Sequence, residues 1–470
     1  MSATAPRPSV VDAPAQPRRR ALLLAYYYPP CGGVPVMRWL RFTRNLPSRG
    51  WLCDVVTQRD GSDDYFRPDP TLLSQIPPEA TLIRIEDPAQ RVVAFLNAHT
   101  KVRWGPWLDR VVKVVPVPDD KLGWGLRVKR YVRAHRERLG GYAVLIATGY
   151  PWSTLVVAPF VKRMLGLPLL VDLRDPWSQH PGIRVADWLH RRMERRVFQA
   201  ADLVCVISEG MREMYASLYP DVADRIRVVY NGIDYSVTPR GEPRPQSRGD
   251  EARSARRLRI VYAGSLLDKP EPKPYQRTLV PFLETLVELR RRHPDLAARC
   301  EVEVLSNPVP KTRALAMRLG VADLIRFSDG RVPFETVQQA QRNADVLLLV
   351  STSDPDYDRM VMTGKIFEYI AAARPILALC TAESDVGQTV KRFALGRVES
   401  SPTAGADALA ALLEPGAAWC AAFADGVRAA QDHFDVQRQL DRMVEMLDEL
   451  AATGRATPPS RSSAPHAARR

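Results

Sequence analysis

The chain has 470 residues, 46% of them apolar, and its 67 Lys and Arg against 53 Asp and Glu give a formal net charge of +14. The length exceeds one compact core, because a domain usually holds about 100–200 residues, and the apolar content excludes a mainly disordered chain. A charge excess of this size would by itself favour a nucleic acid or a membrane surface as partner.

The first 20 residues are predicted to be a disordered basic tail, since they hold four Arg, one Asp and few large apolar side chains. A buried strand at 21–26 and a helix at 35–49 follow. Gly32 and Gly33 lie between them, where glycines let backbone N–H groups approach an anion or a sugar. A plain tight turn explains the pair equally well.

A strand at 53–57 is followed by a local basic stretch. Residues 101–138 hold eleven Lys and Arg against four acidic residues, and they include Trp104, Trp107 and Trp124. Basic residues interleaved with Trp suit an anionic membrane interface. The alternative is an ordinary solvated helix whose Trp side chains pack inward.

Strands are next expected at 143–147, 169–172 and 203–207. Asp172–Trp177 follows the second of these directly, and Asp172, Arg174 and Asp175 are costly to bury unless they are paired or functional. We interpret them as a polar wall at the strand's carboxyl end, with Arg174 held by an Asp. The alternative is an ion pair that only shapes a loop.

Residues 236–258 are predicted to be a linker that ends the first domain. The segment 236–259 holds seven Arg and three acidic residues, and 455–470 adds four Arg and no acid, so a disordered tail is expected at 454–470. Together with the first tail these segments account for +11 of the net charge, which excludes a strongly basic folded body.

The alternation of strands and helices restarts after the linker. The expected strands are 259–263, 301–305, 325–328, 345–350 and 375–379, and the expected helices are 279–292, 366–373 and 435–450. A Gly turn at Gly264 and Ser265 ends the first strand, and Lys269 and Lys273 follow it. Either lysine could hold a diphosphate as a flexible point charge, or both could be solvated loop residues.

The strongest pattern spans Thr363–Pro375. Thr363 and Gly364 can open a helix whose free N–H groups face a diphosphate, with Lys365 beside them. Glu368 lies one turn into that helix, where a carboxylate can accept both hydroxyls of a ribose. An ordinary helix start with a Glu favoured by the dipole is the alternative.

The order of elements predicts an α/β fold of two doubly wound, Rossmann-like domains that face a central cleft. The expected domains are 21–235 and 259–425, followed by a helical segment 426–453 that crosses back to the first domain. In such sheets ligands bind at the carboxyl ends of the strands.

The chain is expected to be cytoplasmic. Its six cysteines show no CxxC or metal spacing and indicate reduced thiols. No stretch approaches the roughly 20 apolar residues of a membrane span. Arg18–Arg20 before Ala21–Leu24 resembles a signal peptide, but the apolar run is too short and ends in Tyr26–Pro30.

Six segments together resemble the family 4 retaining glycosyltransferases, which have the GT-B fold. They occur in the family's order, with a linker in the right place: Tyr28–Gly33, Asp172–Trp177, Val228–Asp234, Ile260–Ser265, Phe327–Pro333 and Thr363–Pro375. The resemblance runs from about residue 21 to about residue 450. The branch that looks most similar occurs among bacterial surface-polysaccharide transferases.

The resemblance implies a nucleotide-sugar donor held by the second domain, without a divalent metal or other cofactor. Glu368 matches the family's ribose-binding Glu, Gly364 and Lys365 lie where the diphosphate-facing helix begins, and Gly264 and Lys269 lie at its basic loop. Gly33 and Asp172–Asp175 would face the reacting sugar and a saccharide or lipid-linked acceptor. Frequent use of lipid-linked acceptors in the family favours peripheral membrane contact at 101–138.

Three departures from the family's pattern stand out. The first Glu of its E-x7-E pattern would fall at 360, where this chain has Met360, and the usual Arg after the loop glycine is Ser265. The acidic residues near Met360 are Asp354, Asp356 and Asp358. A histidine common in the first domain's cleft is absent from 148–153, where Tyr150 or Ser153 would stand in its place.

Three alternatives to a transferase stay open. A sugar-nucleotide epimerase keeps the fold but lacks an evident acid/base set. A non-catalytic scaffold protein is favoured by the missing Glu and Arg. A nucleic-acid-binding protein comes last, because the folded body carries so little of the net charge.

Overall fold

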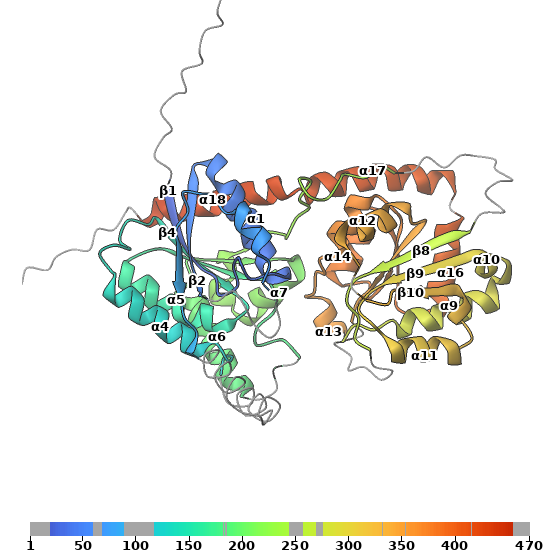
Figure 1. Cartoon of the computed structure of the whole chain (residues 1–470), viewed down its shortest axis with the longest axis horizontal. Coiled ribbons are helices and arrows are strands. Elements are labelled where there is room, and N and C mark those ends of the chain that lie inside the picture. The colour runs from blue at the N-terminus through green and yellow to red at the C-terminus, as the bar shows by residue number, and fades with distance from the viewer. Residues whose placement is uncertain are drawn as a thin grey trace, which may run out of the picture. The chain divides into compact units, whose positions relative to one another are not determined.

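The computed structural model describes residues 19–59, 68–88, 117–181, 183, 186–243, 257–268, 276–330, 332–352, 354–414 and 416–454 (Figure 1). These residues form two sheets. The first has seven strands in the order β3-β2-β1-β4-β5-β6-β7, and the second has six in the order β10-β9-β8-β11-β12-β13. Neighbouring strands pair in parallel, so the predicted pair of Rossmann-like sheets is confirmed.

The first sheet uses strands and helices in alternation. Its strands are β1 Arg19–Leu24, β2 Trp51–Gln58, β3 Leu82–Ile85, β4 Val144–Gly149, β5 Leu169–Leu173, β6 Leu203–Val206 and β7 Ile226–Val228. The helices between them are α1 Val34–Asn45, α4 Leu122–Ala134, α5 Trp152–Leu165, α6 Asp187–Ala200 and α7 Glu209–Leu218.

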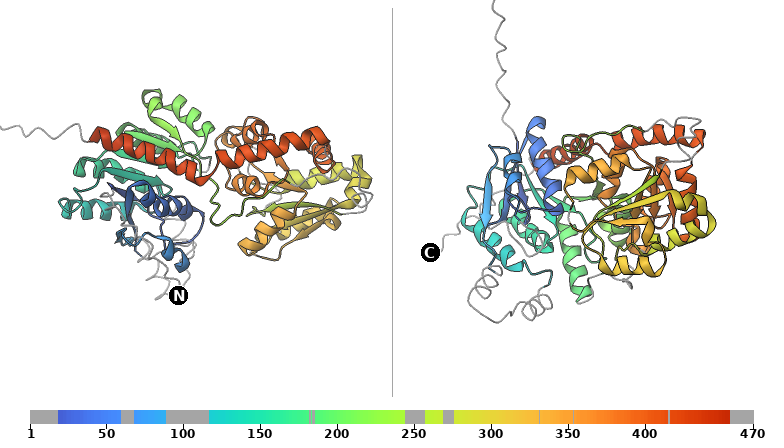
Figure 2. Two further views of the ribbon diagram at one scale, coloured as in Figure 1. Left: turned by 90° about the horizontal axis from the view of Figure 1, so that it is seen from above. Right: turned by 45° about the vertical axis from the view of Figure 1, so that its right-hand side comes forward.

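The second sheet repeats this alternation. Its strands are β8 Leu258–Ala263, β9 Cys300–Leu305, β10 Ile325–Phe327, β11 Val346–Val350, β12 Ile376–Leu379 and β13 Gly396–Glu399. The helices in this part of the chain, of which Figure 2 gives two further views, are α9 Val280–Arg292, α10 Pro294–Arg299, α11 Pro310–Arg318, α12 Phe334–Asn343, α13 Pro355–Asp358, α14 Lys365–Ala372, α15 Asp385–Arg392, α16 Pro402–Leu413 and α17 Ala417–His433, and α18 Val436–Gly454 follows them.

Strand β1 begins at Arg19, two residues before the expected start of the strand at 21. Arg20 belongs to the sheet because its guanidinium donates to both carboxylate oxygens of Asp54, at 2.7 and 2.6 Å. Asp54 is 1% exposed, and a carboxylate buried to this extent needs a partner that offsets its lost solvation. The prediction of a tail through residue 20 is therefore wrong at its last two positions.

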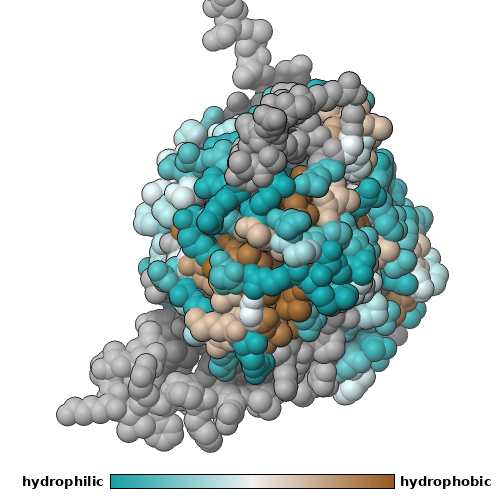
Figure 3. All heavy atoms as spheres, turned by 90° about the vertical axis from the view of Figure 1, so that its right-hand side faces the viewer, coloured by the Kyte–Doolittle hydropathy of each residue, from teal (hydrophilic) through white to brown (hydrophobic). Residues whose placement is uncertain are grey.

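The core of the second sheet is a cluster of buried side chains from β8, β9, β11, α9 and α16. Ile260, Val302 and Leu348 point into it from the sheet, and Phe282 and Leu409 from the helices. Burial of this apolar surface drives the layered arrangement. By contrast, the molecular face drawn in Figure 3 is largely hydrophilic, with smaller apolar areas between polar side chains.

Contacts divide the chain into two compact units. One contains residues 1–171, 200–202 and 444–470, and the other contains 172–199 and 203–443. Helix α18 therefore ends in the first unit, where Asp448 accepts hydrogen bonds from Arg19 at 2.8 Å and from the indole of Trp51 at 3.1 Å.

No helix in the described ranges combines the length and the apolar composition of a transmembrane span. All six cysteines are free thiols, and Cys420 alone among the six is partly exposed.

Candidate functional site

The N-terminus of α14 carries most of the predicted donor-binding residues. Gly364 is the exposed N-cap, and no side chain caps the helix. Thr363 is buried beside it. An uncapped N-terminus presents backbone N–H groups and the positive end of the helix dipole, which together favour an anion.

Lys365, the first residue of α14, lies against the Gly turn after β8. Its Nζ is 5.3 Å from the ring centroid of Tyr262, and a Cβ built on Gly264 would lie 2.1 Å from its Cε. Gly264 also has φ +137°, which disfavours any side chain. The structure thus brings together Gly264 and Lys365, which lie 101 positions apart in the sequence.

The electrostatic state of Lys365 follows from this packing. Its pKa is lowered to about 8, chiefly by burial and also by the nearby positive charge of Arg277, whereas Glu368 acts in the opposite direction. The ammonium group of Lys365 loses solvation by water when it is buried. A bound diphosphate would replace that solvation, so this site favours an anion.

Arg277 is the cation that sequence reasoning missed. Its guanidinium donates to Thr363 Oγ1 at 3.2 Å. The Leu267 N–H donates to the Arg277 carbonyl at 3.1 Å, which holds Arg277 close to the end of β8. Lys365 and Arg277 are therefore two cations beside one uncapped helix N-terminus.

Of the predicted residues Ser265 and Lys269, the structure describes only Ser265. Ser265 is exposed, and its carbonyl accepts a hydrogen bond from the Tyr262 hydroxyl at 3.3 Å. Lys269 and Lys273 lie outside the described residues. The described cations of the site are thus Lys365 and Arg277.

Glu368 lies in the first turn of α14, as predicted, and is partly exposed. One of its carboxylate oxygens accepts from the Gln341 amide at 3.1 Å. Gln341 is 2% exposed on α12, so this bond fixes the direction of the carboxylate. An oriented carboxylate suits the recognition of paired hydroxyls.

The three acidic residues near Met360 have structural roles or point to solvent. Asp358 accepts from Thr381 N and Oγ1, at 2.8 and 2.7 Å, and from the hydroxyl of Ser351, so it joins the ends of β11 and β12. Asp354 caps α13 by accepting from the N–H of Tyr357 at 3.0 Å, and Asp356 is exposed.

The polar residues at the end of β5 and directly after it differ in their exposure. Asp172 is fully buried within the strand, whereas Arg174 is partly exposed and Asp175 is exposed. His180 follows on the same loop, where burial lowers its pKa and the charge of Asp175 raises it.

A buried glutamate on α6 holds this loop in place. Glu194 is 0% exposed and accepts from Ser178 N at 3.2 Å, from Tyr215 and Tyr219 at 2.8 Å each, and from the Ser178 hydroxyl. Tyr215 in turn accepts from Trp177 N at 2.9 Å. Burial raises the pKa of Glu194, and these four donors oppose the shift.

The glycines after β1 occupy the turn into α1. Gly32 is buried, and Gly33 is the exposed N-cap of α1 with φ +90°, a conformation that favours glycine. Val34, the next residue, is 84% exposed.

Tyr150 and Ser153 are distinguished by their contacts. Ser153 is 1% exposed and donates through its N–H and its hydroxyl to Asp119, at 2.9 and 2.6 Å. Tyr150 remains partly exposed, with its ring 6.2 Å from that of Tyr27. Of the two, Tyr150 is the residue available to a ligand.

The basic stretch 101–138 is described only from residue 117. Trp124 on α4 is fully buried and packs against Tyr26 at 5.3 Å, so the inward-packing alternative holds for this Trp. Trp104 and Trp107 lie outside the described residues.

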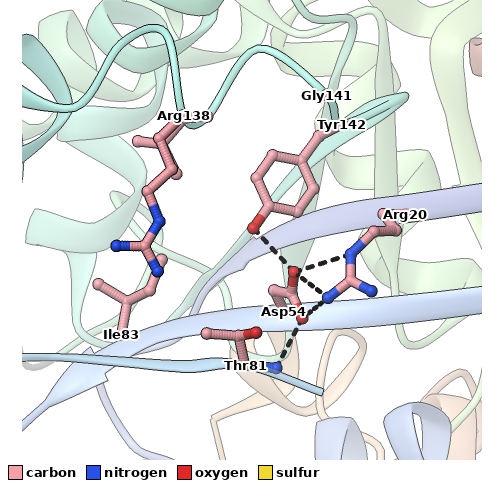
Figure 4. A pocket seen from close by; sticks show the side chains of 8 residues that line it. Arg20, Asp54, Thr81, Ile83, Arg138, Gly141 and Tyr142 are labelled. Atoms are coloured by element: carbon pink, nitrogen blue, oxygen red, sulfur yellow. Dashed lines mark hydrogen bonds and ion pairs between the residues drawn. The ribbon is translucent and has the colours of Figure 1, made fainter. Parts of the chain in front are cut away.

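A cavity of about 220 Å³ lies at the amino ends of β1, β3 and β4, away from the residues above (Figure 4). Asp54 lies at its centre, but Arg20, Thr81 N (2.7 Å) and the Tyr142 hydroxyl (2.8 Å) already donate to its oxygens. The described residues also contain no group of three or more His, Cys, Asp or Glu side chains placed to hold a metal ion.

Comparison with known proteins gives a family match for part of the chain. Residues 35–237 match the model of Glycosyltransferase Family 4. These residues belong to glycosyltransferase family 4. The chain is also 30% identical over 112 residues to the alpha-maltose-1-phosphate synthase of Mycolicibacterium smegmatis. That match covers 22% of this chain and 28% of the relative, so the chain spans less than a third of the relative's length.

Solved structures with low sequence identity show the fold over more than nine-tenths of the chain. The sucrose-phosphate synthase from Thermosynechococcus elongatus gives a TM-score of 0.60 at 16% identity, covering 93% of this chain and 100% of that one. The α,α-trehalose 6-phosphate synthase from Burkholderia multivorans gives 0.59 at 15%, covering 93% and 98%. Anabaena HepE in complex with UDP gives 0.58 at 14%, covering 92% and 100%. The expected GT-B fold is thereby confirmed.

Proposed function

We propose that the protein is a retaining glycosyltransferase that moves a sugar from a nucleotide-sugar donor to a hydroxyl of a saccharide or lipid-linked saccharide. The observation that carries the proposal is the pair of cations, Lys365 and Arg277, beside the uncapped N-terminus of α14, with Glu368 one turn along. A diphosphate needs positive charge and free N–H donors, and a ribose needs a fixed acceptor.

The chemistry assigned to these residues is stabilisation of the leaving diphosphate. Negative charge grows on the diphosphate as its bond to the sugar breaks, and fixed positive groups lower the energy of that state. In the retaining reaction the acceptor hydroxyl enters beside the leaving diphosphate, which takes its proton. Because Lys365, Arg277 and the helix N-terminus supply the positive charge, the proposal includes no divalent metal and no other cofactor.

The acceptor side is assigned to the loops after β1 and β5. Gly33 offers an exposed backbone, and Asp175 and Arg174 offer polar groups that can bind saccharide hydroxyls. Asp172 is buried, so its role is to support the end of β5.

UDP-glucose is the first donor to test, since Anabaena HepE shares the fold and was crystallised with UDP-glucose. The proposed setting is synthesis of a cell-surface polysaccharide or glycoconjugate in the cytoplasm, with peripheral contact to an anionic membrane through residues 101–138.

The decisive experiment is transfer or donor hydrolysis by the Glu368→Ala variant. The proposal expects activity to fall at least about 10-fold, the effect of losing a charged hydrogen bond. Glu335→Ala is the matched control, because Glu335 is also a first-turn acid on a helix of the second sheet but is exposed on α12. Full activity in Glu368→Ala would remove the assignment.

A scaffold protein without catalysis is the second candidate. It is favoured by Met360 and Ser265, which stand where the family has Glu and Arg. Failure of every nucleotide sugar to bind would support it, whereas binding with donor turnover would exclude it.

A further inference from the structure

Helix α6 has two contrasting faces. Its buried residues are His190, Glu194, Val197 and Phe198. Its outer face presents Trp188, which is 71% exposed, and four exposed arginines: Arg191, Arg192, Arg195 and Arg196. At about 100° per residue, these five side chains span an arc of about 140°, with Trp188 close to its middle.

The positive charge on this face is poorly compensated. Arg191 pairs with Asp187 at 2.9 Å, and Arg195 is 3.9 Å from Asp221. Arg192 and Arg196 make no ion pair with any residue in the described part of the chain. The outer face of α6 therefore keeps a net positive charge.

Helix α9 carries an arginine cluster that is neutralised. Arg290, Arg291 and Arg292 are consecutive, and each has its own carboxylate, at 2.6 Å from Asp323, 2.7 Å from Glu288 and 2.7 Å from Asp407. Three arginines in sequence thus leave no excess charge there. The contrast makes α9 a natural control for α6.

We propose that the outer face of α6 binds an anionic phospholipid surface. Lipid phosphates complement the unpaired arginines, each worth about 1 kcal/mol near an anionic membrane, or about fivefold in affinity. Trp188 adds an indole, which prefers the boundary between headgroups and acyl chains. These five side chains lie on one side of α6, an arrangement that suits a planar partner.

This inference assigns lipid binding to a face that the proposed function does not use, and it stands without the proposed transferase activity. The sequence-based expectation placed membrane contact at residues 101–138, and α6 lies outside that stretch. Lipid binding by α6 and donor binding by α14 use different residues, so either can fail alone.

The test is co-sedimentation of the full-length protein with phosphatidylcholine vesicles that contain about a third phosphatidylserine. Arg192→Gln with Arg196→Gln should weaken binding about 25-fold, the product of two fivefold losses. Arg290→Gln with Arg291→Gln removes the same formal charge from α9 and should change binding less than twofold. Circular dichroism melting and titration with UDP-glucose should give wild-type values for the α6 variant.

Two further measurements test whether a lipid surface is the partner that binds the outer face of α6. Trp188→Ala should weaken binding to the same vesicles, and brominated lipids should quench less tryptophan fluorescence in that variant than in the wild type. Binding should vanish on pure phosphatidylcholine and weaken with added salt.

Three outcomes would overturn the proposal. One is unchanged vesicle binding in the Arg192→Gln, Arg196→Gln variant. Another is loss of binding only when Arg130 and Arg133 on α4 are reversed in charge. The last is tight binding of duplex DNA through α6 with no vesicle binding, which would assign this face to a nucleic acid.

Discussion

Lys365 occupies the space that a side chain at position 264 would need. A Cβ on Gly264 would lie 2.1 Å from Lys365 Cε and 2.8 Å from its Nζ. Gly264 is thus required both by its backbone conformation and by the lysine, which is held beside the N-terminus of α14.

Gly264→Ala should therefore displace Lys365 and weaken nucleotide-sugar binding about as much as Lys365→Met. Strain at a positive φ should also lower the free energy of unfolding by about 1–3 kcal/mol. Gly320→Ala is the matched control, because Gly320 has φ +69° but no atom within 4 Å of its added Cβ. Calorimetric titration and thermal melting measure the two effects; equal nucleotide affinity in both variants would contradict the role of Lys365.

Nucleotide-sugar affinity should depend on pH through Lys365. Its pKa of about 8 means that the free protein loses this charge above pH 8, whereas bound diphosphate favours the charged form. Affinity should be constant below pH 8 and fall by up to about tenfold per pH unit above it. Lys365→Met should bind weakly, with no such pH dependence, and an unchanged pH profile in Lys365→Met would refute the assignment.

The free energy of unfolding should also depend on pH through Lys365. The folded pKa of about 8 lies below the unfolded value near 10.5, so the unfolded chain binds the proton more strongly. The free energy of unfolding should therefore rise between pH 8 and 10.5, and Lys365→Met should lack this rise. Urea titrations at several pH values measure it.

Arg277→Gln should lower kcat/KM for the donor by about 10–100-fold, the range for losing a hydrogen bond from a charged group. The control is Arg290→Gln, which removes an exposed arginine on α9. Comparable kinetics in the two variants would mean that Arg277 only supports Thr363.

Glu194→Gln should destabilise the protein by about 1–3 kcal/mol, since an amide cannot accept all four hydrogen bonds that the carboxylate accepts. The loop from Asp175 to Ser178 depends on this network, so transfer should slow while nucleotide affinity stays constant. Tyr219→Phe removes one donor and should have a smaller effect. Thermal melting and transfer assays compare the variants, and an unchanged melting temperature in Glu194→Gln would count against the network.

The sequence predicted the features that are formed by residues close together in the chain. Thr363, Gly364 and Glu368 are neighbours on one helix, so their spacing predicts their common site. Most strands were predicted because they are buried and apolar. Strands β3 and β13 were not predicted, because each has only four residues and includes charged side chains.

Features that depend on long-range contacts could not be predicted. Arg277 contacts Thr363 only in the folded chain, where the Leu267 N–H holds Arg277 close to the end of β8, and Glu194 lies in an arginine-rich helix that looks solvated throughout. Trp124 was one of three Trp residues in a basic stretch, and only packing against Tyr26 shows that it faces inward.

The central claim is that α14 and its two cations bind a nucleotide sugar. Thermal-shift titration with UDP-, GDP- and dTDP-sugars, applied to the wild type and to Glu368→Gln, tests it most directly. At least one sugar nucleotide should stabilise the wild type, by about 2.7 kcal/mol at a hundredfold excess over Kd, and stabilise Glu368→Gln much less. No shift with any donor, or equal shifts in both proteins, would contradict the account.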